Sequence, residues 1–261
     1  MAQKLTLEFN PKNFEDFIQR LKELYNINDT IKVKIDKNKI LMYSTISNES
    51  AVLALKTFSL NTPDYLLGYE EDFILDFIIT QSNKLIKSIS FFETTKPIKC
   101  DIIYKESLDS SGTMLVRSAQ FYSGRLKITT IGGESYKIRD LNQSLLDKRL
   151  DPTNAIWSFK TTNADFLDIK KLSAINSEDK IIDVSVNEGI VKASELGKWE
   201  LEIDKIESKR NYNISFLKKY LSNINLEEEW INFYIFDTFI LVKDTNSNLM
   251  LSYEQDFEVE D

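Results

Sequence analysis

The stretch NADFLDIKKLSAINSEDKIIDVSVNEGIVKAS, residues 163–194, decides the fold when it is set beside NFEDFIQRLKELYNINDTIKVKIDKNKILMYS, residues 13–44. Each begins with apolar residues three and four positions apart, which marks one helix face, and continues with the period-two alternation of a strand. Residues that tolerate positive φ then predict a tight turn before a second strand. Each stretch therefore predicts a helix followed by a β-hairpin, and the repeat about 150 residues on predicts a duplicated chain.

A shorter version of this signal recurs inside each half. Residues 73–79 read as a strand that leads into a helix at 81–92, and residues 210–214 lead into a helix at 215–224. The remaining strand-like runs are 5–9, 51–60, 98–105, 114–122, 125–131, 156–160, 198–206, 231–236 and 239–243. Because most of these runs alternate, they predict half-buried antiparallel strands. The sequence predicts an α+β protein with similar domains at 1–132 and 155–261, joined by a connector at 133–154.

Composition excludes several kinds of chemistry. The chain has no histidine and a single cysteine, Cys100, so it lacks an imidazole base, a Ser-His-Asp or Cys-His pair, a zinc site and an internal disulfide. It contains no GxxxxGK[ST] or GxGxxG run for a phosphate. These absences exclude chemistry that depends on histidine, on a cysteine pair, on zinc or on a phosphate-binding loop, and they leave carboxylate chemistry.

Carboxylate runs leave one enzymatic alternative open. Residues 70–72, 227–229 and the acidic tail at 256–261 could hold Mg²⁺ for phosphodiester hydrolysis, as in a nuclease. Such runs are ordinarily solvated surface. Cleavage of labelled DNA that a Glu→Gln change abolishes would favour this alternative.

The first residues and the hydropathy predict a cytoplasmic protein. The start MAQKLTLEF does not have the layout of a secretory signal, and no apolar run approaches the roughly 20 residues of a membrane span. We expect no membrane partner.

Lysines on the helix faces opposite the apolar residues are the positive signal for function. A helical wheel predicts that Lys84 and Lys87, Lys170 and Lys171, and Lys218 and Lys219 point away from the core. The first helix differs, because Arg20 and Lys22 share its predicted exposed side with Glu15, Asp16 and Glu23. Exposed lysines also serve solubility, and the net charge of −8 disfavours a large positive surface. Lysines gathered on one layer would reconcile these facts.

Taken together, the duplicated helix-plus-hairpin pattern, the connector and the helix lysines resemble the DNA sliding clamps, such as the proliferating cell nuclear antigen and the T-even phage polymerase clamp. The closest local likeness is residues 162–194, which resemble the opening of the second domain of phage clamps. The resemblance implies two domains of the DNA-clamp fold, each a duplicated β-α-β-β-β unit with antiparallel sheets outside and two helices inside.

The resemblance further implies a function and partners. The chain would be a viral or phage DNA polymerase processivity factor, a homotrimeric ring that encircles double-stranded DNA without reading its sequence and tethers the DNA polymerase and other replication proteins. It would not be an enzyme and would have no catalytic residues, metal ligands or cofactors. If the chain is encoded by a phage, it would act in the host cell cytoplasm. The implied DNA-facing residues are Lys84, Lys87, Lys170, Lys171, Lys218 and Lys219, with Arg20 and Lys22 as weaker candidates.

The polymerase and the clamp loader would bind in an apolar groove beside the connector, near Leu141, Leu145 and Leu146. Residues 114–122 of one subunit and 180–186 of the next would pair at their edges to close the ring. The rival from another class is a non-enzymatic phage adaptor or structural interaction protein with duplicated domains, and solution mass separates the two.

Overall fold

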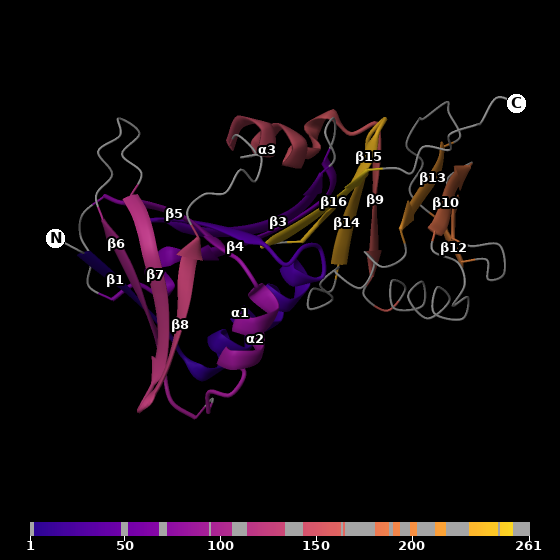
Figure 1. Cartoon of the computed structure of the whole chain (residues 1–261). Coiled ribbons are helices and arrows are strands. Elements are labelled where there is room, and N and C mark those ends of the chain that lie inside the picture. The colour runs from indigo at the N-terminus through magenta and orange to yellow at the C-terminus, as the bar shows by residue number, and fades with distance from the viewer. Residues whose placement is uncertain are drawn as a thin grey trace, which may run out of the picture. The chain divides into compact units, whose positions relative to one another are not determined.

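The chain divides into two units in the computed structural model of residues 1–261 (Figure 1). The structure describes residues 3–47, 52–67, 72–93, 95–105, 114–133, 143–162, 164, 181–187, 190–193, 199–202, 212–217, 230–244 and 246–252. Unit 1 comprises Met1–Thr45 and Lys56–Asp140, and unit 2 comprises Ile46–Leu55 and Leu141–Asp261. The sequence predicted a first domain at 1–132, whereas residues 46–55 within that range group with unit 2.

Unit 1 contains two successive strand, helix and three-strand patterns. The first is made of β1 (Gln3–Phe9), α1 (Pro11–Tyr25), β2 (Ile31–Asp36), β3 (Lys39–Ser47) and β4 (Val52–Asn61). After a 3₁₀ turn at Thr62–Asp64, the second is made of β5 (Ile74–Ile79), α2 (Ser82–Ile89), β6 (Ile98–Lys105), β7 (Met114–Ser123) and β8 (Leu126–Gly133). Each periodic segment of the sequence in this unit has become the expected type of element.

The two patterns of unit 1 exchange their first strands. The strand order is β1-β6-β7-β8 on one side and β5-β2-β3-β4 on the other, so β1 joins the strands of the second pattern and β5 joins those of the first. The two sides meet where Ile78 and Ile79 of β5 pair with Gly133 and Gly132 of β8. This exchange ties the two halves of the unit into one body.

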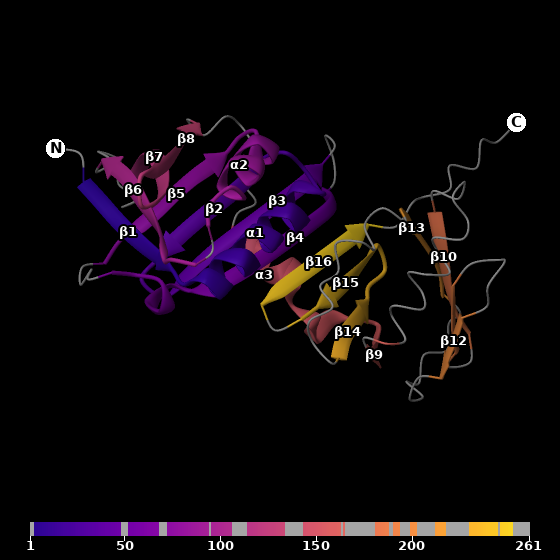
Figure 2. The same ribbon diagram turned by 90° about the horizontal axis from the view of Figure 1, so that it is seen from below.

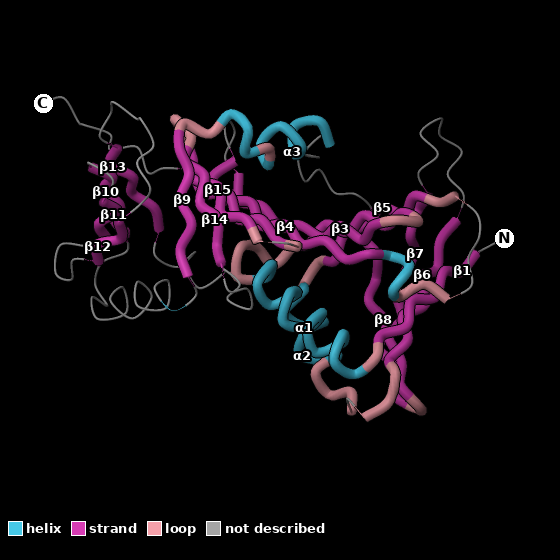
Figure 3. The backbone as a smooth tube through the Cα atoms, turned by 180° about the vertical axis from the view of Figure 1, so that it is seen from behind, coloured by secondary structure: helices cyan, strands magenta, loops and turns pink. Residues whose placement is uncertain are grey.

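Both helices lie side by side on one face of the unit 1 strands (Figures 1 and 3). The core between them is rich in aromatic rings, among which Phe9 lies 5.0 Å from Phe17 and Phe14 lies 6.4 Å from Phe121 between centroids. The strands supply alternate residues to this core, as β1 does with Leu5, Leu7 and Phe9. Burial of the apolar faces is therefore what holds the helices on the sheets.

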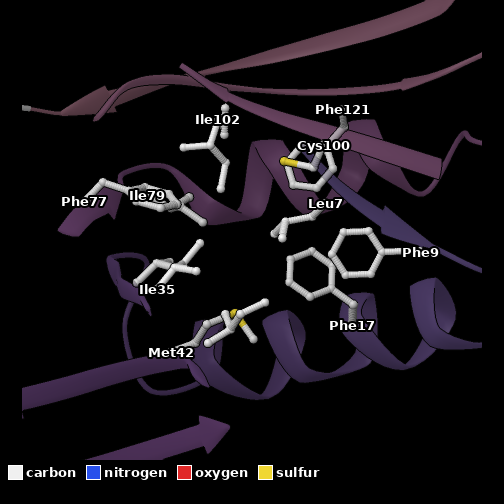
Figure 4. A pocket seen from close by; sticks show the side chains of 13 residues that line it. Leu7, Phe9, Phe17, Ile35, Met42, Phe77, Ile79, Cys100, Ile102 and Phe121 are labelled. Atoms are coloured by element: carbon white, nitrogen blue, oxygen red, sulfur yellow. The ribbon is translucent and has the colours of Figure 1, made fainter. Parts of the chain in front are cut away.

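A small apolar cavity of about 30 Å³ remains inside this core (Figure 4). Leu7, Cys100 and Phe121 line it from one group of strands, Met42 lines it from the other, and Phe17 lines it from α1. The Cys100 thiol is buried, and desolvation raises its pKa well above the ordinary value.

Unit 2 repeats the strand exchange. Its first group has the order β4-β16-β15-β14-β9, with β9 at Trp157–Thr162, β14 at Trp230–Ile235, β15 at Phe239–Lys243 and β16 at Ser247–Ser252. Its second group has the order β12-β11-β10-β13, with β10 at Ile181–Asn187, β11 at Ile190–Ala193, β12 at Trp199–Glu202 and β13 at Tyr212–Leu217. In chain order, β9 comes before β10–β12, and β13 comes before β14–β16. Strand β9 nevertheless pairs with β14, and β13 pairs with β10, as β1 and β5 do in unit 1. The duplication predicted from the sequence is therefore visible in the topology.

Strand β4 is shared between the two units. Its residues 52–55 belong to unit 2, where the Ser252 hydroxyl donates a 2.7 Å hydrogen bond to the Val52 carbonyl oxygen, and its remaining residues belong to unit 1. The connector contributes α3 (Gln143–Leu150) and a 3₁₀ turn at Pro152–Asn154.

Two expectations from the sequence are wrong. The expected helix at 215–224 cannot begin at Ser215, because Ser215, Phe216 and Leu217 belong to β13, where Phe216 pairs with Ile182 and Ile214 pairs with Val184. The expected interface strands are also wrong: β7 lies between β6 and β8, and β10 lies between β11 and β13, so neither strand offers a free edge.

Candidate nucleic-acid interface

The exposed face of α1 carries more positive charge than the sequence suggested. Phe14, Phe17 and Leu21 are buried against the sheets, which leaves Lys12, Glu15, Gln19 and Lys22 on the outer face. The helix begins after Asn10, whose side-chain oxygen accepts a 2.8 Å hydrogen bond from the Asn13 N–H. Pro11 suits the first turn because that position needs no N–H donor.

Arg20 and Glu23 are not on the exposed side of α1, which corrects the sequence assignment. Each is 5% exposed. The Arg20 guanidinium lies 3.4 Å from carboxylate oxygens of both Asp16 and Glu23 and 4.6 Å from the centre of the Phe58 ring. Lys56 reaches the other Glu23 oxygen at 3.5 Å. Arg20 is therefore occupied inside unit 1 and is not a candidate for contact with DNA, whereas Lys22 is exposed.

The second helix presents Lys84 and Lys87 on its outer face, as predicted. Both side chains are exposed, while Leu85, Ile86 and Ile89 are buried. The start of α2 is held by a residue from another segment, which no local sequence pattern indicates. Asp29, in the loop between α1 and β2, accepts hydrogen bonds on Oδ1 from the Asn83 N–H and the Ser82 hydroxyl, each at 3.0 Å. Gln81 precedes the helix in the left-handed region at φ 58°.

Three sheet lysines of unit 1 are paired with carboxylates, whereas, in the described part of the chain, the exposed lysines of the two helices are not. On the sheets, Lys4 pairs with Asp101, Lys99 with Glu8 and Lys32 with Asp76, at 3.4, 3.2 and 3.4 Å. Burial lowers the pKa of the Lys32 ammonium, and the Asp76 charge opposes that shift. Within the described residues, Lys12, Lys22, Lys84 and Lys87 make no ion pair, so the positive charge of the α1/α2 layer remains available to an anion.

The remaining candidates for contact with DNA lie outside the described residues. These are Lys170 and Lys171 in the expected helix after Ala164, and Lys218 and Lys219 directly after β13. They stay predictions.

The connector helix α3 lies against β15 and β16 of unit 2 (Figure 2). A guanidinium nitrogen of Arg149 lies 3.8 Å from the Met250 sulfur, and the Lys243 ammonium donates a 3.3 Å hydrogen bond to the Leu150 carbonyl oxygen. The backbones of Leu145 and Leu146 belong to α3, but their side chains and the whole of Leu141 lie outside what the structure describes. The apolar groove for partners stays a prediction.

Few of the predicted carboxylate ligands can be located. Asp72 is exposed and lies 2.6 Å from the Lys37 ammonium, whereas Glu70, Glu71, residues 227–229 and the acidic tail fall outside the described residues. Over the part of the chain that is described, His, Cys, Asp and Glu side chains form no group of three that could hold a metal ion. No described helix combines the length and the hydropathy needed to cross a membrane.

Comparison with solved structures identifies the architecture. The β chain of DNA polymerase III from Streptococcus pneumoniae matches with a TM-score of 0.61 at 11% identity, over 96% of this chain and 65% of that one. The β subunit from Thermotoga maritima matches with a TM-score of 0.61 at 13% identity, over 96% and 65%. This chain has the sliding-clamp fold. The predicted fold class is thereby confirmed.

A third match is the Helicobacter pylori β clamp bound to a DNA ligase peptide, with a TM-score of 0.62 at 10% identity, over 96% of this chain and 66% of that one. The chain thus spans about 65% of the length of the clamps it matches. No protein-family model and no curated protein sequence matches the chain. At such low identity the likeness establishes the fold, while function has to be argued from the residues.

Proposed function

We propose that this protein is a DNA polymerase processivity factor, a homotrimeric ring that encircles duplex DNA and performs no chemistry of its own. The observation that carries the proposal is the set of exposed lysines without ion pairs to any described residue on the α1/α2 layer of a sliding-clamp fold. These are Lys12, Lys22, Lys84 and Lys87, whereas Lys4, Lys32 and Lys99 on the strands are neutralised by carboxylates. Loose lysine contacts to phosphates hold a duplex without reading its sequence.

The internal duplication supports a head-to-tail ring. Strand β4, whose residues 52–55 belong to unit 2, neighbours β16, the last strand of that unit. The equivalent strands are β12 in unit 2 and β8 in unit 1. Strand β12 pairs only with β11, and Leu126–Ile131 of β8 pair only with β7, within the described residues. Pairing β8 of one subunit with β12 of the next would repeat the β4–β16 arrangement and remove both exposed edges.

The partners of the ring would be a DNA polymerase and a clamp loader. The support is the position of α3 on the β15 and β16 strands, beside which a peptide groove would lie, and the ligase peptide bound by the Helicobacter pylori clamp. Leu141, Leu145 and Leu146 are the candidates for that groove.

The test compares DNA binding by two double variants, each of which replaces two lysines with glutamates and so changes the net charge by the same amount. Lys84→Glu/Lys87→Glu should weaken retention on duplex DNA and reduce the salt dependence of binding by about 2 units of slope per subunit, since each lost phosphate contact removes about 0.9. Lys4→Glu/Lys99→Glu, on the opposite face of the sheet, is the control and should leave retention unchanged. Equal effects of both pairs would refute the proposal that the helix layer faces DNA.

A further inference from the structure

Phe91, two residues after the last residue of α2, is the most exposed large hydrophobic side chain in the described part of the molecule. It is 81% exposed, against 48% for the next, Ile74. Nearly the whole ring is therefore available for contact, although its neighbour Phe92 is 5% exposed.

The backbone of Phe91 is held firmly despite this exposure. The Ser90 hydroxyl donates to the Ile86 carbonyl oxygen at 2.7 Å, and the Phe91 N–H donates to that of Ser88 at 3.3 Å. On the other side, the Phe92 N–H donates to the Ile89 carbonyl oxygen at 3.2 Å, and the Phe92 ring meets Phe14 edge-on at 6.0 Å. A ring presented from an anchored backbone loses little conformational freedom when it binds something.

Phe91 follows the two exposed lysines of α2 closely along the chain. Lys84 and Lys87 are exposed on the helix, which ends at Ile89, and Phe91 lies in the turn two residues later. Glu93, two residues further on, is exposed, and so is Lys96, which offsets its charge. The segment 84–91 thus combines unpaired positive charge with a free aromatic face.

This combination suits single-stranded nucleic acid. Ammonium groups attract phosphates, and an exposed ring offers a stacking platform that accepts any base because every base has a π face. In a duplex those faces are covered by neighbouring bases, so an aromatic ring can stack only where the strand is unpaired.

We propose that Phe91, with Lys84 and Lys87, forms a stacking site for an unpaired base where a single strand leaves the duplex. The proposal rests on the proposed function for the direction in which α2 faces. With this site, the α1/α2 layer would bind primer–template junctions more tightly than uniform duplex. This preference adds to the sequence-independent binding of phosphates by the lysines.

The experiment compares two fluorescent probes by anisotropy, a blunt duplex and the same duplex with an unpaired overhang, using the full chain. Phe91→Ala should lower affinity for the overhang probe by about tenfold and change affinity for the blunt probe less than twofold, because stacking of one base contributes about that factor. Phe91→Trp should restore the preference, and its added fluorescence should be quenched by the overhang probe only.

The outcomes separate this site from the proposed function. No loss with Phe91→Ala, or equal loss on both probes, would overturn the stacking site. A reduced solution mass of Phe91→Ala would also overturn it, since the ring would then contact another copy of the chain. Loss of blunt-duplex binding in Lys84→Glu/Lys87→Glu tests the helix layer itself and does not depend on Phe91.

Discussion

The ammonium group of Lys56 belongs to a charged cluster inside unit 1. Its side chain is 2% exposed, and its partner is Glu23, which also pairs with Arg20. A buried charge destabilises the fold when a partner is removed, because the remaining ion pairs and hydrogen bonds no longer offset the free-energy cost of desolvation. Because Arg20 and Glu23 are inside this cluster, the exposed charges of α1 are those of Lys12, Glu15 and Lys22.

Lys56→Met should therefore lower the free energy of unfolding by about 3 kcal/mol, since Glu23 loses one of its cations in a buried setting. Chemical denaturation measures the change. The control Lys99→Met removes an exposed pair with Glu8 and should cost at most about 1 kcal/mol. The double change Glu23→Leu/Lys56→Met should recover much of the loss, and a double variant as unstable as Lys56→Met alone would contradict the account.

Cys100, the single cysteine, gives a second test at this scale. Its thiol is buried beside the apolar cavity, and burial raises its pKa. A thiol reagent should react only when unit 1 opens, so the labelling rate should rise with denaturant in step with unfolding. The thiol has a higher pKa in the folded protein than in the unfolded chain, so the unfolded chain loses the thiol proton at a lower pH. The contribution of this group to the free energy of unfolding is therefore complete below the ordinary thiol pKa and is lost as the pH rises above it. Rapid labelling in native buffer would show that the core is open.

At the scale of elements, the start of α2 depends on a residue from another segment. Asp29 accepts hydrogen bonds from Asn83 and Ser82, more than 50 positions along the chain. Asp29→Ala should therefore lower the free energy of unfolding by about 1 kcal/mol, as loss of an N-terminal cap does. Thermal unfolding measures this, with the exposed Asp64→Ala as a control that changes it by less than about 0.5 kcal/mol. Similar losses in both variants would mean that Asp29 contributes only charge.

Local periodicity predicted the unit 1 elements because each one buries a single face. In residues 13–24 the apolar side chains recur every three or four positions, and this segment lies in α1. In residues 98–105 every second side chain is apolar, and this segment is β6. The same reasoning misassigned Ser215–Leu217, since a short apolar run fits either period until its partner is known, and here the partner is β10. Arg20 and the Asp29 cap were missed for the same reason, because their contacts come from tertiary packing.

At the scale of the whole molecule, the sequence could not reveal that residues 46–55 belong to unit 2. The hydrogen bond between Ser252 and Val52 joins positions 200 residues apart, and no local pattern encodes such a pairing. The strand exchange is equally non-local, since β1 pairs with β6 and β9 pairs with β14. Topology therefore shows which strand edges have no partner within the described residues, and this the sequence alone does not reveal.

The open edges lead to a prediction about assembly. If β8 of one subunit pairs with β12 of the next, a variant carrying both Thr129→Cys on β8 and Glu200→Cys on β12 should cross-link with a flexible bismaleimide into species of two and three copies of 30.3 kDa. The series should stop at three copies, because a closed ring leaves no free end. Buried Cys100 should not take part.

Variants with only one added cysteine, besides the buried Cys100, provide the control for direction. Thr129→Cys alone should not cross-link to itself, whereas mixing it with Glu200→Cys should give pairs but no triples, because each chain then carries one reactive edge. Denaturing gels and light scattering of the uncross-linked protein, expected at three times 30.3 kDa, measure both results. Self-linking of Thr129→Cys would indicate a two-fold interface, and a ladder beyond three copies would indicate an open filament, since a head-to-tail contact that does not close continues indefinitely. Either result would exclude the trimeric ring while leaving the fold of each unit as described.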